Sequence, residues 1–360
     1  MNMEQRKQIS FKGQKIFIGL DVHAKSWTAT VMTASTAGKT FRQDPDPDAL
    51  YKYLHHNYPD AEYYSVYEAG FCGFWIHDAL EARGIHNIVV NPSDVPTTFG
   101  EKVSKTDPVD SRKLARSLRA QELKGIYTPS RENLELRSLT RLKDSITKDM
   151  TRQKNRIKSF LKFYGIEVPD IYSSASRNWT SHYVKWLRSL NGETPYAKDT
   201  LDCMISQLEQ LRSQRLALLR NVRGILRKDA YKRTVEILMS VPGIGQLTSM
   251  TLIAEIMDIT RFRNSDRLAS FVGLVGMTHS SGEHQGNGAI TVRKNGILRA
   301  SLVEAAWKAI SEDPALALCY GNHCKRMPKQ KAIIRIARKL IDRIYFVLKN
   351  NTEYVTGVIQ

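Results

Sequence analysis

Four acidic residues are the strongest candidates for chemistry in this sequence: Asp21, Glu68, Asp107 and Asp110. Asp107 precedes Pro108, and proline favours the first position of a helix, so we expect Asp107 to be the N-cap of a helix that begins at Pro108. Asp110 would then lie on the same helical face as Asp107. Taken alone, this pair is explained by helix-start chemistry, since acids at a helix N-terminus complement its dipole.

Asp21 and Glu68 give the pair a second explanation. Each of them follows a run of β-forming residues, where a single acid usually belongs to a turn. Four converging carboxylates in a basic protein instead indicate a Mg²⁺ site, because hard cations prefer carboxylate oxygens. Two such ions ~3.5–4 Å apart can activate an attacking oxygen and stabilise a leaving oxygen in phosphoryl transfer. The metal would also relieve the mutual repulsion that otherwise raises the pKa values of grouped acids.

The elements that must position these acids follow from the hydrophobic pattern of the first 128 residues. Three short β-forming runs come first, and helical segments then alternate with strands, an order that predicts an α/β domain. Ligands of such domains gather beyond the carboxyl ends of strands, which is where Asp21 and Glu68 lie. We expect strands at 15–20, 26–32, 39–42, 62–67 and 86–90, and helices at about 46–57 and 73–83.

The charge of the chain indicates a polyanionic partner. Its 360 residues include 54 Lys and Arg against 36 Asp and Glu, a formal net charge of +18. No apolar run approaches the ~18 residues of a membrane span, and the N-terminus lacks the apolar stretch of a signal peptide. We therefore expect a cytoplasmic protein that binds nucleic acid and has no membrane partner. The four cysteines fit reduced thiols better than a metal site, although Cys319, His323 and Cys324 are closely spaced.

Residues 130–228 are expected to form two long helices paired as an antiparallel hairpin. Nine basic residues against two acids lie between Arg137 and Phe163, which favours an arm that contacts nucleic acid or dimerises over a merely solvated face. The second helix has apolar residues that alternate by three and four, as in a coiled coil. This apolar stripe consists of Leu201, Met204, Leu208, Leu211, Leu218, Val222 and Ile225.

The last third of the chain contains two candidate DNA-binding features. The turn at Val241-Pro242-Gly243-Ile244-Gly245 is typical of helix-hairpin-helix proteins, in which N–H groups beside glycines approach phosphate, although an ordinary helical turn also fits. Ser280-Ser281-Gly282 lies in a polar, glycine-rich stretch that we expect to be a loop. A serine there needs activation to be a nucleophile, and His279 or a metal-bound carboxylate could supply the base.

These features divide the chain into three expected domains. Residues 14–128 form a catalytic α/β domain, 129–230 a helical coiled-coil arm, and 231–350 a mainly α C-terminal domain that ends in a helix over about 329–348. Positive charge, the hairpin glycines and the serine motif mark the residues expected to contact nucleic acid. They are Lys105, Arg112, Arg152, Lys154, Arg156, Lys158, Gly243, Gly245, Ser280, Arg293, Lys294, Arg335 and Arg338.

Taken together, the motifs resemble the DEDD insertion-sequence transposases, and the resemblance covers essentially the whole chain in order. Ile18-Gly19-Leu20-Asp21-Val22-His23, Tyr67-Glu68-Ala69-Gly70 and Lys105-Thr106-Asp107-Pro108-Val109-Asp110 resemble the three acidic motifs of that family. Four further motifs resemble its C-terminal domain. They are Val241-Pro242-Gly243-Ile244-Gly245, Phe271-Val272-Gly273-Leu274-Val275, Ser280-Ser281-Gly282, and Lys331-Ala332-Ile333-Ile334 with Ala337-Arg338-Lys339-Leu340. The sequence departs from the family pattern at Glu283, where a glycine is expected.

The resemblance implies more than the residues alone. It implies an RNase H-like N-terminal domain, as in Holliday-junction resolvases, whose four acids form a catalytic tetrad that binds Mg²⁺. It also implies that Ser281 attacks DNA and becomes covalently joined to it, with Ser280 as the alternative. A structured bridge RNA would pair with donor and target DNA, while the protein reads the RNA by shape and phosphates, which suits the charge of +18. Dimers would pair into a tetramer, with the acids of one subunit completing the serine site of another.

The leading prediction is therefore an insertion-sequence recombinase of the bacterial cytoplasm and nucleoid that cleaves, exchanges and rejoins DNA strands. Two other functions fit parts of the sequence. A metal-dependent hydrolytic junction resolvase would use a metal-bound water, and Ser281 would be only structural. A nucleic-acid-binding scaffold would use its acids as caps and turn residues, and Asp21→Asn or Asp107→Asn would then leave every activity intact.

Overall fold

The computed structural model describes residues 10–36, 38–103, 106–174, 176–192, 194–281 and 284–356, and its side chains are described except at 102–103, 277–281 and 284–289. The chain divides into two compact units, Met1–Pro129 and Ser130–Gln360. The long helices and the C-terminal helices thus fall in one unit. The expected division of this unit into an arm and a C-terminal domain remains a prediction.

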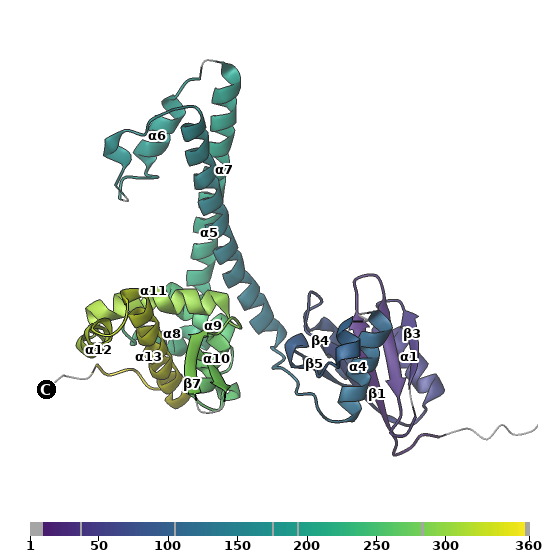
Figure 1. Cartoon of the computed structure of the whole chain (residues 1–360). Coiled ribbons are helices and arrows are strands. Elements are labelled where there is room, and N and C mark those ends of the chain that lie inside the picture. The colour runs from purple at the N-terminus through teal and green to yellow at the C-terminus, as the bar shows by residue number, and fades with distance from the viewer. Residues whose placement is uncertain are drawn as a thin grey trace, which may run out of the picture. The chain divides into compact units, whose positions relative to one another are not determined.

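The first unit is built on a mixed five-stranded sheet (Figure 1). β1 (Lys15–Val22), β2 (Trp27–Met32) and β3 (Lys39–Gln43) pair antiparallel, whereas β4 (Glu62–Glu68) and β5 (Ile85–Val90) continue the sheet on the other side of β1 in parallel. The strand order is β3-β2-β1-β4-β5. All five expected strands are confirmed, and with them the α/β class.

Helices cover both faces of this sheet. α1 (Pro47–Asn57) and α2 (Trp75–Glu81) bury Leu50, Leu54, Ile76 and Leu80 against residues of β1 and β2. α4 (Asp107–Arg119) packs Leu114 against Val66 and Val90 on the opposite face. Two short helices, the 3₁₀ turn Pro92–Asp94 and α3 (Phe99–Val103), lie in the stretch where only a loop was expected.

The absence of a side chain at Gly19 lets α4 lie directly on β1. A Cβ added there would lie 2.1 Å from the carbonyl oxygen of Ser111 and 2.4 Å from the backbone nitrogen of Ala115. Such distances are far below van der Waals contact. A buried hydroxyl pair, Thr30 Oγ1 and Ser111 Oγ at 2.8 Å, fixes α4 to β2 as well. The start of α4 is therefore held in a fixed place relative to β1.

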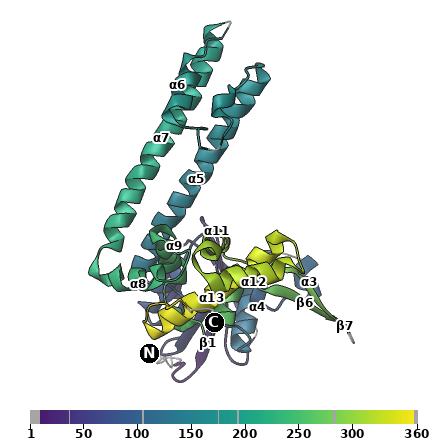
Figure 2. The same ribbon diagram turned by 90° about the vertical axis from the view of Figure 1, so that its left-hand side faces the viewer.

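Two long helices dominate the second unit (Figure 2). α5 (Arg131–Phe163) and α7 (Pro195–Leu226) lie side by side as the expected hairpin, with the 3₁₀ turn Asp170–Tyr172 and α6 (Ser181–Ser189) between them in the chain. Leu201 and Leu208 of the apolar stripe on α7 are buried against Ile157 and Leu161 of α5 and Leu187 of α6. These leucines therefore pack within the chain, and a dimer contact would have to use other residues.

The remaining elements form a mainly helical core. Residues of α9, α10, α11 and α13 share one buried cluster that includes Leu252, Leu268, Leu302 and Leu340. Among the residues described, no helix combines the length and hydrophobicity required to cross a membrane. The elements are α8 (Asp229–Met239), α9 (Gln246–Ile256), the 3₁₀ turn Ile259–Arg261, α10 (Ser265–Val272), β6 (Gly276–Ser281), β7 (His284–Ile290), α11 (Gly296–Glu312), α12 (Pro314–Cys324) and α13 (Lys329–Asn350).

The serine motif does not begin in a loop, and that prediction was wrong. Ser280 and Ser281 lie on β6, opposite Gln285 and His284 of β7. Backbone hydrogen bonds hold such a ladder whatever the side chains are, so that a polar, glycine-rich sequence can still form a hairpin. The two serines are therefore the last two residues of β6.

Candidate active site at the carboxyl ends of β1 and β4

The four predicted acids of the first unit converge. β1 and β4 are parallel neighbours with Leu20 opposite Tyr67, so Asp21 and Glu68, the next residues, emerge at the same edge of the sheet. Asp107 and Asp110 lie in the first turn of α4, which Gly19 allows to lie on β1. The sheet edge and the helix start together make one acidic centre.

Asp107 is not the cap of its helix, which corrects the expectation from its sequence. Thr106 is the N-cap residue, because the backbone N–H of Asp110 already donates to the carbonyl of Thr106, at 3.0 Å. Asp107 is thus the first helical residue. Its carboxylate lies 3.5 Å from Nε2 of His23, so this acid is not explained as a helix cap, although it still lies in the first turn of α4.

His23 joins two of the acids and was missed as a site residue. Its Nε2 lies 3.2 Å from Oδ2 of Asp21, and the ligand atoms of Asp21, His23 and Asp107 all lie within 4.8 Å of one another. Carboxylate oxygens and an imidazole at this spacing fit a divalent cation. A signal for His23 was present in the sequence, because it stands two residues after Asp21, directly after the end of β1.

The electrostatics of the centre favour a bound cation. Burial raises the pKa of Asp21, and the neighbouring carboxylates of Asp107 and Asp110 raise it further, while His23 acts in the opposite direction. Repulsion of this kind disfavours the ionised acids when they stand alone, and a cation relieves it.

Lys113 holds the other half of the centre. Its ammonium nitrogen lies 3.1 Å from Oδ1 of Asp110 and 3.4 Å from Oε1 of Glu68, and only 7% of the residue is exposed. Burial alone would lower the pKa of Lys113, but the two carboxylates more than offset this, and the pKa is raised. Lys113 stands three residues after Asp110, a helical spacing that could have identified it in the sequence.

Two family models match the chain. A model of the DEDD transposase of IS110 matches residues 18–166, which include all four acids. A second model, the transposase IS116/IS110/IS902 family, matches residues 235–320. The chain belongs to the DEDD insertion-sequence transposase family. It is therefore an enzyme that recombines DNA, and members of its family typically use a divalent metal.

Individual relatives have related names. The y4rJ protein of Sinorhizobium fredii, named as a transposase, is 27% identical over 77% of this chain and 74% of its own. The transposase for insertion sequence element IS1533 of Leptospira borgpetersenii is 25% identical over 70% of this chain and 72% of its own. A pilin gene-inverting protein of Moraxella bovis is 30% identical over 33% of this chain and 38% of its own.

The predicted nucleic-acid residues of the transposase differ in their surroundings. Arg112, Arg293, Lys294 and Arg335 are exposed. Arg338, in contrast, is bound by two acids, with Nη1 2.5 Å from Oδ1 of Asp342 and Nη2 2.5 Å from Oδ1 of Asp266. Its guanidinium is largely neutralised and ties α13 to α10. Lys105 lies outside the described residues, as do the side chains of Ser280 and Ser281.

The basic arm of the transposase has a concentrated positive patch on its two long helices. Burial lowers the pKa of Lys154, and the cations of Arg212, Lys158 and Arg215 lower it further. Arg152 and Arg156 are exposed nearby on α5, where Arg152 pairs with Asp149. Mutual repulsion among these cations favours an anionic partner.

The glycine turn between α8 and α9 packs differently from the expected phosphate contact. Gly243 has φ +82°, and its backbone N–H donates to Oε2 of Glu312 at 2.7 Å. This hydrogen bond lowers the pKa of Glu312, as Lys308 also does. Gly245, the N-cap of α9, has open space around its Cα. The donor of Gly243 is thus engaged within the unit, and Gly245 is the glycine that a phosphate could approach.

A buried carboxylate links the base of the arm to the chain that follows the β6–β7 hairpin. Glu255 of α9 is 1% exposed and accepts hydrogen bonds from Arg141 of α5 at 2.7 and 2.9 Å and from the side-chain amide of Asn295 at 2.8 Å. Asn295 is in turn the N-cap of α11. No sequence pattern predicted this three-way contact, because its members are far apart in the chain.

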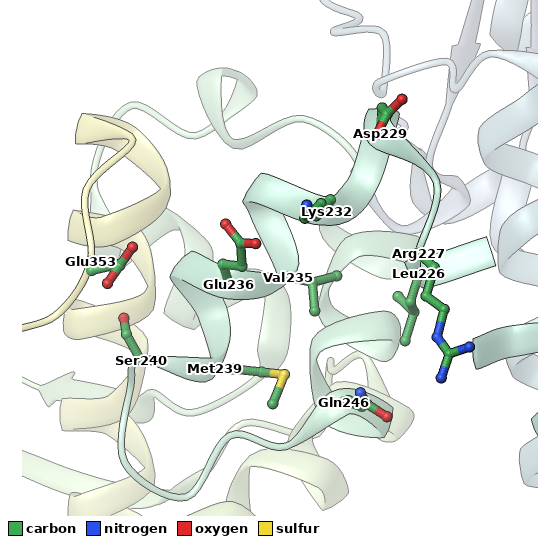
Figure 3. Close-up of a pocket in the computed structure, with 10 residues that line it drawn as sticks. All are labelled: Leu226, Arg227, Asp229, Lys232, Val235, Glu236, Met239, Ser240, Gln246 and Glu353. Atoms are coloured by element: carbon green, nitrogen blue, oxygen red, sulfur yellow. The ribbon is translucent and has the colours of Figure 1, made fainter. Parts of the chain in front are cut away.

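An open hollow of about 730 Å³ lies beside α8 (Figure 3). It mixes charges of both signs on flexible surface side chains, and the close-up shows Glu236 and Glu353 without a convergent set of acids. We assign it no catalytic role. Its lining residues are Leu226, Arg227, Asp229, Lys232, Val235, Glu236, Met239, Ser240, Gln246 and Glu353.

Proposed function

We propose that this transposase cleaves, exchanges and rejoins DNA strands at an RNase H-like centre formed by Asp21, Glu68, Asp107 and Asp110. The convergence of these acids carries the proposal, together with the release of Asp107 from any capping role. The strand order β3-β2-β1-β4-β5, antiparallel on one side of β1 and parallel on the other, supports the RNase H-like assignment.

The centre would hold Mg²⁺ through Asp21 and Asp107, with His23 beside them. Hard carboxylate oxygens suit this ion, and the half-exposed carboxylate of Asp107 leaves the site open to a DNA phosphate. When bound, Mg²⁺ supplies charge stabilisation to a reacting phosphate. Glu68 and Asp110 complete the tetrad, and Lys113 keeps the two carboxylates close together.

Ser281 is the proposed nucleophile, with Ser280 as its neighbour on β6. Its oxygen would displace a DNA oxygen at phosphorus, so that the serine–phosphate ester keeps the energy of the broken bond. The released DNA hydroxyl of a partner strand could then attack this ester and restore the serine. The Moraxella relative is named for gene inversion, which requires cut DNA strands to be rejoined and cannot be achieved by hydrolysis alone.

Guide RNA and oligomerisation belong to the same proposal. The net charge of +18 and the patch around Lys154 suit more than one nucleic acid. We propose donor and target double-stranded DNA together with a structured bridge RNA as partners, and dimers that assemble into a tetramer. The protein would act in the bacterial cytoplasm, at the nucleoid.

A covalent-trapping assay tests the proposal. The protein is incubated with Mg²⁺, the RNA transcribed beside its gene and labelled DNA spanning the ends of its element, and is then run on a denaturing gel. We expect a labelled protein band that Ser281→Ala abolishes and Asp21→Asn abolishes or weakens. Asp78→Asn, an exposed acid on α2, should leave the band intact.

Each other result has a definite meaning. A band lost in Ser280→Ala but retained in Ser281→Ala would move the nucleophile by one residue. Cut DNA without any covalent band would contradict the serine mechanism and favour a hydrolytic junction resolvase. Full activity in both Asp21→Asn and Asp107→Asn would contradict the acidic centre itself.

A further inference from the structure

A hollow of about 350 Å³ opens directly beside the acidic centre, between the β1–β2 turn and the loop from β4 to α2. Val22 and His23, which follow Asp21, form part of its wall. Phe71 and Cys72, which follow Glu68 by three and four residues, form another part. The two strand ends that carry the acids thus also carry the walls of this hollow.

The hollow is lined mainly by aromatic and aliphatic side chains, and two of the aromatic ones are exposed to solvent. Phe71 is 72% exposed and Trp75 is 51% exposed, although Trp27 and Ile76 beneath them are fully buried. The rings of Trp75 and Trp27 lie 6.1 Å apart, so that a buried indole supports the exposed one. Large aromatic rings exposed together beside a polar centre indicate a binding surface.

We propose that this hollow binds an unpaired nucleobase of the DNA strand whose phosphate lies at the acidic centre, by stacking on Phe71 and Trp75. The inference rests on the proposed function, which places that phosphate. Stacking suits the lining, because every base has a π-face and the wall offers few polar groups with which to read base identity. A paired base keeps its neighbours and cannot enter, so the hollow would favour DNA that is unwound or branched at the reacting phosphate.

The size and position of the hollow favour a base over a protein segment. It lies at the small end of the ~300–1,000 Å³ range of ligand pockets. His23 is shared between the hollow and the acidic centre, so a ligand in one must lie next to a ligand in the other. Lys25, exposed two residues after His23, can contact the backbone phosphates of the same strand.

Binding to forked DNA tests this inference without any cleavage. The probe is a fluorescent duplex with a tail of unpaired thymidines, compared with a fully paired duplex of equal length, in Ca²⁺ and with the full-length protein. We expect Phe71→Ala to weaken binding of the fork about fivefold or more, with no change for the duplex. Phe71→Tyr, which keeps a ring that can stack, should bind the fork like the natural protein.

The matched control is Phe99→Ala, because Phe99 is 84% exposed in the same unit but does not line the hollow. Its affinity for both probes should not change. Trp75→Leu should repeat the effect of Phe71→Ala. Because Phe71 is mostly exposed, its replacement should leave the melting temperature unchanged, and a loss of fork affinity is then not a loss of folding.

Three outcomes would overturn the inference. They are unchanged affinity of Phe71→Ala for the fork, equal losses for fork and duplex, and a change of oligomeric state in sedimentation without a change in DNA binding. The last outcome would assign the surface to a contact between copies of the chain. If the covalent band is absent but Phe71→Ala still weakens only the fork, the catalytic proposal fails and the base-binding hollow stands.

Discussion

The ammonium nitrogen of Lys113 lies 3.1 Å from Oδ1 of Asp110, three residues earlier on α4, and 3.4 Å from Oε1 of Glu68. The acidic centre is therefore divided. Glu68 and Asp110 share the buried ammonium group of Lys113. Asp21 and Asp107, in contrast, have His23 as their shared partner among the residues that the structure describes. The second pair is the part of the centre that most needs a metal ion.

Replacing Lys113 should change how many metal ions the protein binds. Lys113→Met keeps the length of the side chain but leaves Glu68 and Asp110 without a cation, so we expect a further Mn²⁺ to bind, or an existing one to bind more tightly. Titration of Mn²⁺ followed by electron paramagnetic resonance measures this directly. Lys124→Met, an exposed lysine of the same unit, is the control. Identical titrations of both variants and the natural protein would refute the division of the centre.

Asp107→Asn should separate activity from stability. The change removes one of the charges that raise the pKa of Asp21, so we expect the metal-free protein to be more stable by about 1 kcal/mol, a gain typical of relieved active-site strain. Strand cleavage should be lost. Thermal unfolding with a chelator, alongside the trapping assay, checks both effects. A less stable variant would indicate that Asp107 supports the start of α4 after all.

Arg141→Met should destabilise the second unit strongly. It removes the two hydrogen bonds that Arg141 donates to the almost fully buried carboxylate of Glu255. Because the side chain of Arg141 is itself 49% exposed, we expect a loss of about 1–3 kcal/mol. Urea unfolding gives the difference. Arg156→Met is the matched control, since Arg156 is exposed on the same helix and bonds to Gln153. A loss below that of the control would mean that the other neighbours of Glu255, among them Asn295 and Arg137, compensate its charge.

Glu101 should make the first unit sensitive to acid. Burial alone would raise the pKa of Glu101, but hydrogen bonds from Arg116, at 2.7 Å, and from Thr98 lower it from 4.5 to about 2. Because the folded pKa is depressed, the stabilisation is present above about pH 4.5 and is lost as the pH falls towards 2.

Glu101→Gln should therefore lower the melting temperature at pH 6 and flatten its dependence on pH between about 4.5 and 2. Calorimetry across that interval measures both. Glu122→Gln, an exposed acid of the same unit, should leave the pH profile as it is. An unchanged profile in Glu101→Gln would show that this contact does not form in solution.

The two glycines of the turn after α8 should respond differently to alanine. At Gly243 the backbone has φ +82°, and an added Cβ would lie 2.3 Å from the carbonyl oxygen of Ala305 in α11. We expect Gly243→Ala to destabilise the protein by more than about 1 kcal/mol. Gly245→Ala has open space and should be neutral for stability. Chemical denaturation distinguishes them, and equal effects would contradict this packing of the turn against α11.

The strands and the acidic motifs could be predicted from the sequence because their signals are local. Alternating β-forming runs mark strands wherever they occur, and a strand end fixes the place of Asp21 and Glu68. Helical spacing likewise put Asp107 and Asp110 on one face. The exception, the capping role given to Asp107, failed because Thr106 supplies the first helical carbonyl, which is a matter of backbone angles.

Only the tertiary structure decided which distant residues meet. Nothing in the spacing of Gly19 and Ser111 says that α4 must rest on β1, nor that Lys113 lies between Glu68 and Asp110. Glu255, Arg141 and Asn295 come together over a separation of more than a hundred residues. The sequence of this transposase thus determined its elements and the acids that are candidates for its chemistry. Close packing, which acts between any surfaces that fit, decided how the centre is assembled and what lies beside it.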